Sequence, residues 1–121
     1  MADLRVIATG LRFPEGPVAM ANGSVILGEI AGSAVTRVAP DGSKTPIGSA
    51  GGGPNGLARG PDGALYLCNN GGAEYAAGGF LATGPAKNYQ CGYVQRIDPH
   101  TGEMRVLYSP VSYTHLRAHE T

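Results

Sequence analysis

Glu15 and Asn55 are the two residues of this chain whose types and surroundings suggest shared chemistry. Each follows a proline and precedes a glycine, in residues 13–16 (FPEG) and 53–56 (GPNG), at a separation of 40 residues. A carboxylate and an amide carbonyl are hard oxygen ligands, suited to Ca²⁺ or a similar divalent cation and poorly suited to copper or structural zinc. For each residue taken alone there is a simpler explanation: Asn55 is a turn residue, and Glu15 is a solvated surface residue. Their matching positions favour a shared metal site instead.

The elements that must position these residues are short strands separated by turns. The 121 residues include 20 glycines and 9 prolines, and no apolar pattern of helical period extends over three turns, which excludes helical bundles and coiled coils. Turn sequences such as Asn-Gly and Asp-Gly lie between apolar or alternating runs, where they indicate hairpins. The sequence therefore predicts an all-β fold with antiparallel strands at 5–8, 17–20, 25–29, 34–38, 44–48, 56–58, 64–68, 92–98 and 103–108.

An internal repeat organises these strands. At the same offset of 40 residues that relates Glu15 to Asn55, the turn at 22–23 falls on that at 62–63, and residues 25–27 fall on 65–67. Further along, residues 35–38 match residues 94–97 at an offset of 59 instead of 40. The second unit therefore carries about 19 extra residues, at roughly 71–91. A 40-residue unit of four short strands has the length of a β-propeller blade. The alternative is a small sandwich with two similar hairpin pairs.

We therefore predict that residues 1–110 form the N-terminal part of a β-propeller, with blade 1 at about 15–50 and blade 2 at about 55–110. Two blades and part of another cannot close a ring, and a six-bladed ring needs about 240 residues. The chain is thus expected to be incomplete, the first part of a six-bladed protein. Residues 111–116 (VSYTHL) match one reading frame of a sequencing adapter, so residues 111–121 are expected to be non-native, the alternative being a genuine strand with a polar end.

The charge pattern and the cysteine content limit which binding partners and which cellular compartment we expect for the protein. Nine basic and nine acidic residues are scattered singly, which argues against nucleic acid and against a polybasic membrane-binding patch. The N-terminus lacks the apolar stretch of a secretory signal, and no segment approaches the roughly 20 apolar residues of a membrane span. We therefore expect a cytoplasmic protein with no membrane partner. Cys68 and Cys91 are too few for a disulfide framework and are expected to be reduced packing residues.

Three segments carry a resemblance to a known family. Residues 10–18, 53–66 and 92–102 resemble the first two blades of the regucalcin/gluconolactonase family, also called the senescence-marker-protein, gluconolactonase and luciferin-regenerating-enzyme-like family. The likeness covers residues 5 to about 110, and its most specific motifs are the EGP at Glu15 and the PNG at Asn55. The resemblance implies a six-bladed propeller that holds a divalent metal on its axis, Ca²⁺ first, with Zn²⁺ or Mg²⁺ as alternatives, and hydrolyses a sugar lactone such as gluconolactone.

The resemblance assigns roles to few residues. Glu15 matches the metal-ligand Glu of the first blade, and Asn55 matches the Asn that lies beside the metal and the substrate. The other ligands and the Asp proposed as general base come from later blades, so no catalytic residue is expected here and the isolated chain is expected to be inactive. Gly53 stands where some members have an Arg, so the substrate contacts of that subgroup do not carry over. Asn70 is a weaker candidate for substrate binding, with a polar turn that ends a strand as its alternative.

Several alternatives stay open. Residues 71–91 are either a loop over the pocket mouth that shapes substrate choice or an ordinary surface excursion, and Lys87 within them meets either an acidic substrate or water. In place of the lactonase, the motifs are compatible with a related ester or phosphoester hydrolase. They also fit a non-catalytic propeller module that binds proteins or ligands, and a strictosidine-synthase-like propeller with condensation chemistry.

Overall fold

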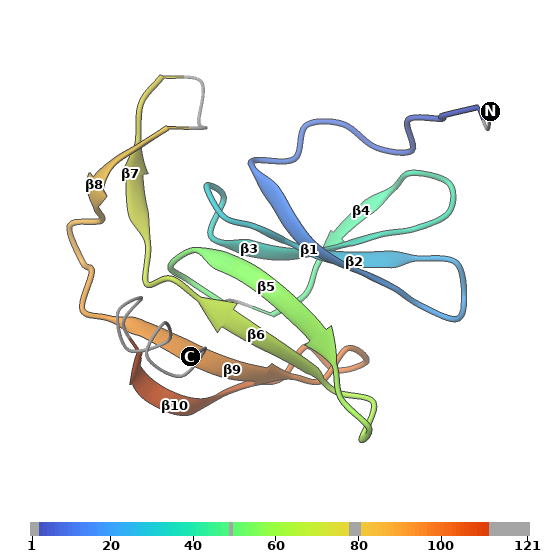
Figure 1. The fold of residues 1–121 in the computed structure, drawn as a ribbon. Coiled ribbons are helices and arrows are strands. Elements are labelled where there is room, and N and C mark those ends of the chain that lie inside the picture. The colour runs from blue at the N-terminus through green and yellow to red at the C-terminus, as the bar shows by residue number, and fades with distance from the viewer. Residues whose placement is uncertain (1–2, 49, 78–80, 112–121) are drawn as a thin grey trace.

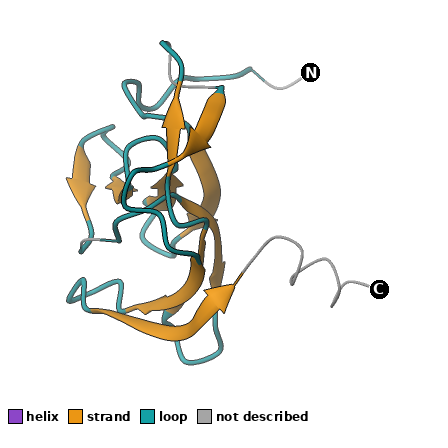
Figure 2. Ribbon diagram, turned by 90° about the vertical axis from the view of Figure 1, so that its left-hand side faces the viewer, coloured by secondary structure: helices purple, strands orange, loops and turns teal. Residues whose placement is uncertain are grey.

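The computed structural model describes residues 3–48, 50–77 and 81–111, which form three antiparallel sheets (Figure 1). Two sheets have four strands and resemble each other in topology; we call them blade 1 and blade 2. Blade 1 has the order β1 (Pro14–Ala19), β2 (Val25–Glu29), β3 (Ala34–Val38) and β4 (Lys44–Pro46). Blade 2 has the order β5 (Pro54–Arg59), β6 (Leu65–Asn69), β9 (Gly92–Ile97) and β10 (Met104–Val111). Between β6 and β9 the chain forms a separate hairpin of β7 (Ala73–Tyr75) and β8 (Ala82–Pro85), which projects from blade 2 (Figures 1 and 2).

The prediction of an all-β fold built from four-stranded units is confirmed, and the strands predicted at 25–29 and 34–38 coincide with β2 and β3. In each unit the first strand is the one nearest to the other unit, and β1 contacts β5. The inserted segment differs from the predicted loop, because it includes the β7–β8 hairpin. The tail predicted at 111–121 begins at the last residue of β10, and residues 112–121, with His115 and His119, lie outside the described residues.

The strand predicted at 5–8 is wrong. In the described part of the chain these residues pair with no other strand, and a strand is stable only through the hydrogen bonds that a neighbouring strand supplies. Leu4 and Val6 are therefore left 100% and 78% exposed. The segment is held instead by Lys44, whose Nζ donates to the carbonyl oxygen of Thr9 (2.6 Å).

Three hairpin turns, two in blade 1 and one in blade 2, have the same conformation. The side chains of Asn22, Asp41 and Asp62 each accept a hydrogen bond from the backbone N–H two residues later, at 2.9 to 3.1 Å. The glycine that follows each of them has a φ between 83° and 90°, a left-handed conformation that favours glycine. A turn that ends in such a glycine makes a G1 bulge, the common three-residue hairpin connection. The Asn-Gly and Asp-Gly signals thus predicted these turns correctly.

The hydrophobic core lies between the two blades. One face of each sheet and the segment that joins β4 to β5 contribute side chains that are 0 to 6% exposed. These pack together: Ile26, Val35, Ile47, Ala50, Leu65, Leu67 and Ile97. Because side chains alternate along a strand, Cys68 of β6 points away from this core and is exposed. Cys68 and Cys91 are free thiols, but the packing role predicted for Cys68 is wrong in this chain.

Two glycines allow the blades to approach closely. A Cβ atom at Gly16 would lie 2.5 Å from the carbonyl oxygen of Asn55, and one at Gly28 would lie 2.6 Å from that of Pro54. The beginning of β5 therefore lies directly against β1 and β2.

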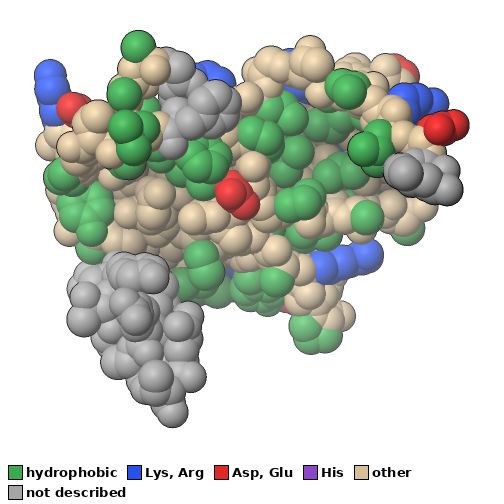
Figure 3. Space-filling model, turned by 45° about the horizontal axis from the view of Figure 1, so that its top comes forward, with side chains coloured by type: hydrophobic (Ala, Val, Ile, Leu, Met, Phe, Trp, Pro, Cys, Tyr) green, Lys and Arg blue, Asp and Glu red, His purple; other side chains and the backbone are tan. Residues whose placement is uncertain are grey.

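On the face shown in Figure 3, acidic and basic side chains are scattered among apolar ones. Within the described ranges, no helix is long and apolar enough to cross a membrane.

Candidate functional site

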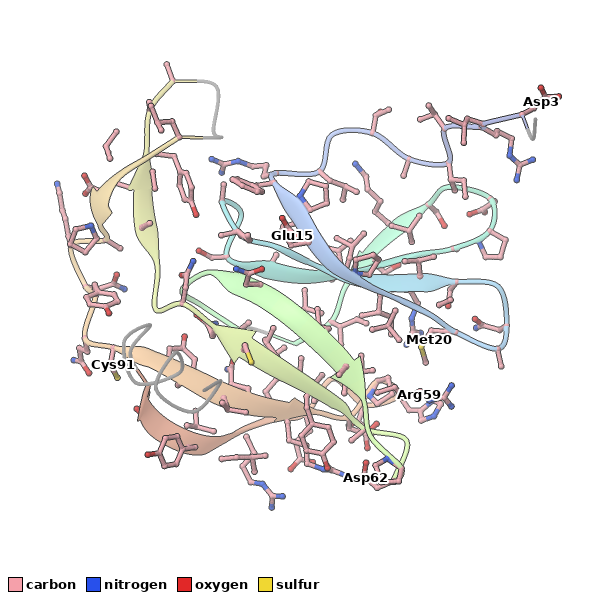
Figure 4. The ribbon with its side chains drawn as sticks, viewed as in Figure 1. Asp3, Glu15, Met20, Arg59, Asp62 and Cys91 are labelled. Carbon is pink, nitrogen blue, oxygen red and sulfur yellow. The ribbon has the colours of Figure 1, made fainter. Side chains whose placement is uncertain are left out.

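Glu15 and Asn55 occupy the same position in the two blades. Glu15 is the second residue of β1 and Asn55 the second residue of β5, the two strands that pack together where the blades meet. Figure 4 shows Glu15 near the beginning of β1, beside β5. The close contact between Gly16 and the backbone of Asn55 joins the two positions directly. The structure thus brings together the two residues that the sequence selected as metal ligands.

Both positions also interrupt the regular strand pairing. The register of β1 with β2 shifts between Glu15 and Val18, and that of β5 with β6 shifts between Pro54 and Gly56. A bulge of this kind turns a side chain away from the regular alternation of its strand and is frequent beside functional sites. The candidate ligands therefore lie at matching irregularities of the two inner strands.

The side chains of Glu15 and Asn55 are available for a ligand. Both residues are exposed, and neither side chain has a hydrogen bond or ion pair with the residues that the structure describes. A carboxylate and an amide oxygen without competing partners fit a hard divalent cation. They supply only part of the six to eight oxygens that Ca²⁺ takes, and the described ranges contain no cluster of three or more His, Cys, Asp or Glu that could hold a metal.

In blade 2 a buried asparagine that the sequence analysis did not select holds the segment before Asn55. Asn69, the last residue of β6, is 4% exposed. Its Oδ1 accepts hydrogen bonds from the N–H groups of Gly53 and Gly71, both at 2.9 Å. Its Nδ2 donates to the carbonyl oxygen of Gly51 (2.9 Å) and to Oε1 of Gln95 (3.2 Å). One side chain therefore fixes the segment that leads into β5.

Blade 1 repeats this arrangement with other residue types. Glu29 ends β2 as Asn69 ends β6. Its Oε1 accepts a hydrogen bond from the N–H of Arg12 (2.8 Å), ahead of β1, and its Oε2 accepts one from the hydroxyl of Thr36 (2.5 Å). The offsets of 40 and 59 relate Glu29 to Asn69 and Thr36 to Gln95. The repeat therefore contained the signal for this network, which was missed because the residue types differ.

Asn70 forms a polar turn, which was the alternative to its predicted role in substrate binding. Its Oδ1 accepts a hydrogen bond from the N–H of Gly72 (2.8 Å), and its own N–H donates to the carbonyl oxygen of Gly53 (2.9 Å). The side chain lies over Gly53, where an added Cβ would overlap it. Asn70 is thus exposed beside the segment that leads to Asn55, and its role toward a substrate stays a prediction. A larger residue at position 53 does not fit with Asn70 in this place.

The β7–β8 hairpin touches blade 1 just before Glu15. The rings of Tyr75, at the end of β7, and Phe13 have centroids 6.2 Å apart and planes at 59°. Phe13 has a φ of 60°, which is uncommon for a residue other than glycine. Its backbone is held there because its carbonyl oxygen accepts a hydrogen bond from the N–H of Ile30 (3.0 Å). The hairpin therefore borders the candidate site, and its role in substrate choice stays a prediction, as does that of the exposed Lys87.

The groups with shifted pKa values, among them Tyr93 and Asp62 of blade 2, lie outside the candidate site. Burial raises the pKa of Tyr93, whose hydroxyl donates to the carbonyl oxygen of Ala50 (3.1 Å). The hydrogen bond from the Tyr66 hydroxyl lowers the pKa of Asp62, helped by the N–H of Ala64. These groups stabilise local structure in blade 2 and contribute no donor to the proposed metal.

Comparison with known proteins supports the fold. No protein-family description and no curated protein matches the sequence. The structure is similar to the PQQ-bound aldose sugar dehydrogenase of Streptomyces coelicolor, with a TM-score of 0.61 and 21% identity over 90% of this chain and 34% of that one. A candidate gluconolactonase matches with a TM-score of 0.35 and 18% identity, over 84% of this chain and 50% of that one.

The chain therefore spans about a third and about half of the lengths of these two proteins. The first likeness, together with the two repeated four-stranded sheets, establishes that the chain forms blades of a β-propeller. At this identity the likeness concerns the fold alone.

Proposed function

We propose that this chain is the N-terminal part of a metal-dependent hydrolase that opens sugar lactones, as its motifs suggest. The observation that carries the proposal is that Glu15 and Asn55 occupy matching positions in the two blades. Oxygen-bearing side chains stand at the same bulged position of two adjacent inner strands, exposed and without partners among the described residues. A binding module that lacks a metal does not need this coincidence.

The residues of this chain would bind and orient rather than transfer protons. The Glu15 carboxylate would hold the metal, and the Asn55 side-chain oxygen would act as a second ligand while its N–H₂ group orients a substrate oxygen. A divalent ion at this position supplies Lewis-acid chemistry, which polarises an ester carbonyl and lowers the pKa of water. Asn70, beside Gly53, would contact the substrate. The general base would come from a blade beyond this chain.

Lactone hydrolysis by the longer protein, expressed from the uninterrupted gene, tests this proposal. We expect gluconolactone opening, followed by acid release, to stop when the metal is removed with a chelator and to return with Ca²⁺. Three results would instead overturn it. Activity that is unchanged in chelator would exclude the metal, and oxidation of an aldose in the presence of added PQQ, without hydrolysis, would favour dehydrogenase chemistry. Binding of a protein or ligand without turnover would favour the non-catalytic module.

A further inference from the structure

A second polar site lies between the blades, toward the end of the sheets opposite to Glu15. It is a cleft of about 180 Å³ between the end of β4 and the β9–β10 turn. Blade 1 contributes Arg37 and Thr45 to its lining, and the turn in blade 2 contributes His100 and Thr101. The lining residues include an arginine, a histidine and two threonines but no acidic residue. We call it the interblade cleft.

Arg37 is incompletely paired at this cleft. Its Nη2 donates to the carbonyl oxygen of Pro99 (2.5 Å), which links blade 1 to the turn of blade 2. Its Nε is buried and has no hydrogen-bond acceptor among the residues that the structure describes. The guanidinium carries five N–H donors. Among the described residues the structure gives an acceptor to Nη2 alone, so donors other than the buried Nε are left for a ligand with acceptor oxygens.

The size and charge of the cleft define that ligand. Its volume is below the roughly 300 to 1,000 Å³ of pockets for organic ligands, and its donors are those that bind oxyanions, with Arg as the residue suited to phosphate and carboxylate geometry. Two acids flank the turn. Asp98 is engaged in it, where its Oδ1 accepts the N–H groups of His100 (2.8 Å) and Thr101 (3.2 Å), and Glu103 is exposed and is not one of the residues that line the cleft. The surroundings thus favour a small tetrahedral anion.

We propose that the interblade cleft binds a small oxyanion of the phosphate or sulfate type between Arg37 and the β9–β10 turn. Binding uses donors from both blades, so the anion also holds blade 1 against blade 2. This site is separate from the metal proposed at Glu15 and does not depend on it.

Titration of the 121-residue chain with inorganic phosphate, followed by backbone amide NMR at constant ionic strength, tests the site. We expect saturable shifts at His100, Thr101 and Gly102, with a Kd of about 1 mM or lower, and a higher Tm in phosphate. Sulfate should compete, and a sugar phosphate should bind more weakly if only a free anion fits. Shifts that do not saturate, or that chloride reproduces at the same ionic strength, would show charge screening only and would overturn the proposal.

Variants locate the binding. Arg37→Gln should weaken phosphate binding at least tenfold, whereas Arg59→Gln, which removes an exposed guanidinium from β5, should leave the Kd unchanged. Because Arg37 also links the blades, its loss can disturb folding. His100→Gln therefore serves as a second variant, since this exposed turn side chain can be replaced without loss of the core, and it should weaken binding several-fold. Wild-type affinity in both variants would exclude the interblade cleft.

Discussion

Gly16 determines how closely the two candidate ligands can lie. It has a φ of 61°, in the left-handed region, and the carbonyl oxygen of Asn55 occupies the space that a side chain would need. Any other residue would strain the backbone of β1 and push β5 away. The spacing of Glu15 and Asn55 therefore depends on the residue that follows Glu15.

We expect Gly16→Ala to lower the free energy of unfolding by about 1 to 3 kcal/mol, through strain and steric overlap. Gly56→Ala is the matched control, because Gly56 holds the corresponding place in β5, has no atom within 4 Å of an added Cβ and has no left-handed φ. It should be neutral or slightly stabilising. Urea unfolding monitored by circular dichroism measures both. Equal destabilisation by the two substitutions would contradict this account of the contact.

Asp62 makes the stability of blade 2 depend on pH. Its Oδ2 accepts hydrogen bonds from the Tyr66 hydroxyl (2.8 Å) and from Arg96 Nη2 (3.1 Å), and the pKa of Asp62 lies below its ordinary value of 3.8 because of the Tyr66 bond first. A lowered pKa in the folded state stabilises the fold above pH 3.8, and this contribution is lost as the pH falls through the folded-state pKa.

Asp62→Asn should therefore be less stable than the wild type at pH 6, and the difference should shrink as the pH falls below 3.8. Thermal unfolding across this range measures it. High salt should also reduce the difference, because the Arg96 pair is exposed. A constant difference from pH 6 to pH 2 would exclude the carboxylate charge as its cause.

At the scale of elements, a polar side chain at the end of the second strand fixes the segment that leads into the first. Asn69 does so in blade 2 and Glu29 in blade 1. Removing the Asn69 side chain leaves the N–H of Gly53 and Oε1 of Gln95 without their partner in a buried place. The cost of an unpaired buried polar group is about 1 to 3 kcal/mol.

Asn69→Ala should therefore destabilise the chain by about 2 to 3 kcal/mol and broaden the amide signals of residues 51–56. Asn70→Ala, one residue later, removes an exposed side chain with a single bond to Gly72 and should cost less than about 1 kcal/mol. Chemical denaturation and NMR of the two variants check this contrast. A larger effect at Asn70 would show that the segment is held in another way.

The elements differ in how far the sequence could predict them. Turns with Asn-Gly or Asp-Gly were predictable because their conformation is local, and the apolar runs of β2 and β3 lie between such turns. Pairing is not local, so the strand expected at 5–8 was wrong for lack of a neighbour, and the β7–β8 hairpin was missed because its strands are short and half exposed. In the site, the repeat located Glu15 and Asn55, whereas Phe13 and its ring contact with Tyr75 depend on a conformation that no motif indicates.

At the scale of the whole molecule, the last described strand lies at the edge of its sheet. Among the described residues β10 has one sheet neighbour, β9, and Val106, Leu107 and Tyr108 on it are 45 to 53% exposed. An exposed apolar edge strand tends to pair with other chains. The metal site proposed at Glu15 is also incomplete in this chain, since Glu15 and Asn55 supply too few of the oxygens that a divalent cation requires.

The 121-residue chain should accordingly show no lactonase activity, and Ca²⁺ at millimolar concentration should leave its Tm unchanged. A gluconolactone assay and a melting series with Ca²⁺, Mg²⁺ and Zn²⁺ test this expectation. Turnover by the chain alone, or a Ca²⁺-dependent rise in Tm that Glu15→Ala abolishes, would show that the two blades suffice.

Calorimetric titration of the longer gene product with Ca²⁺ tests the role of Glu15 most directly. Glu15→Gln keeps the size of the side chain but removes its charge, and Glu103→Gln makes the same change at an exposed residue beside the β9–β10 turn. We predict at least a tenfold loss of Ca²⁺ affinity for Glu15→Gln, because losing even an outer partner of a metal ligand costs about 10- to 100-fold, and none for Glu103→Gln. Unchanged Ca²⁺ affinity in the Glu15 variant would contradict the metal site on which the proposed function depends.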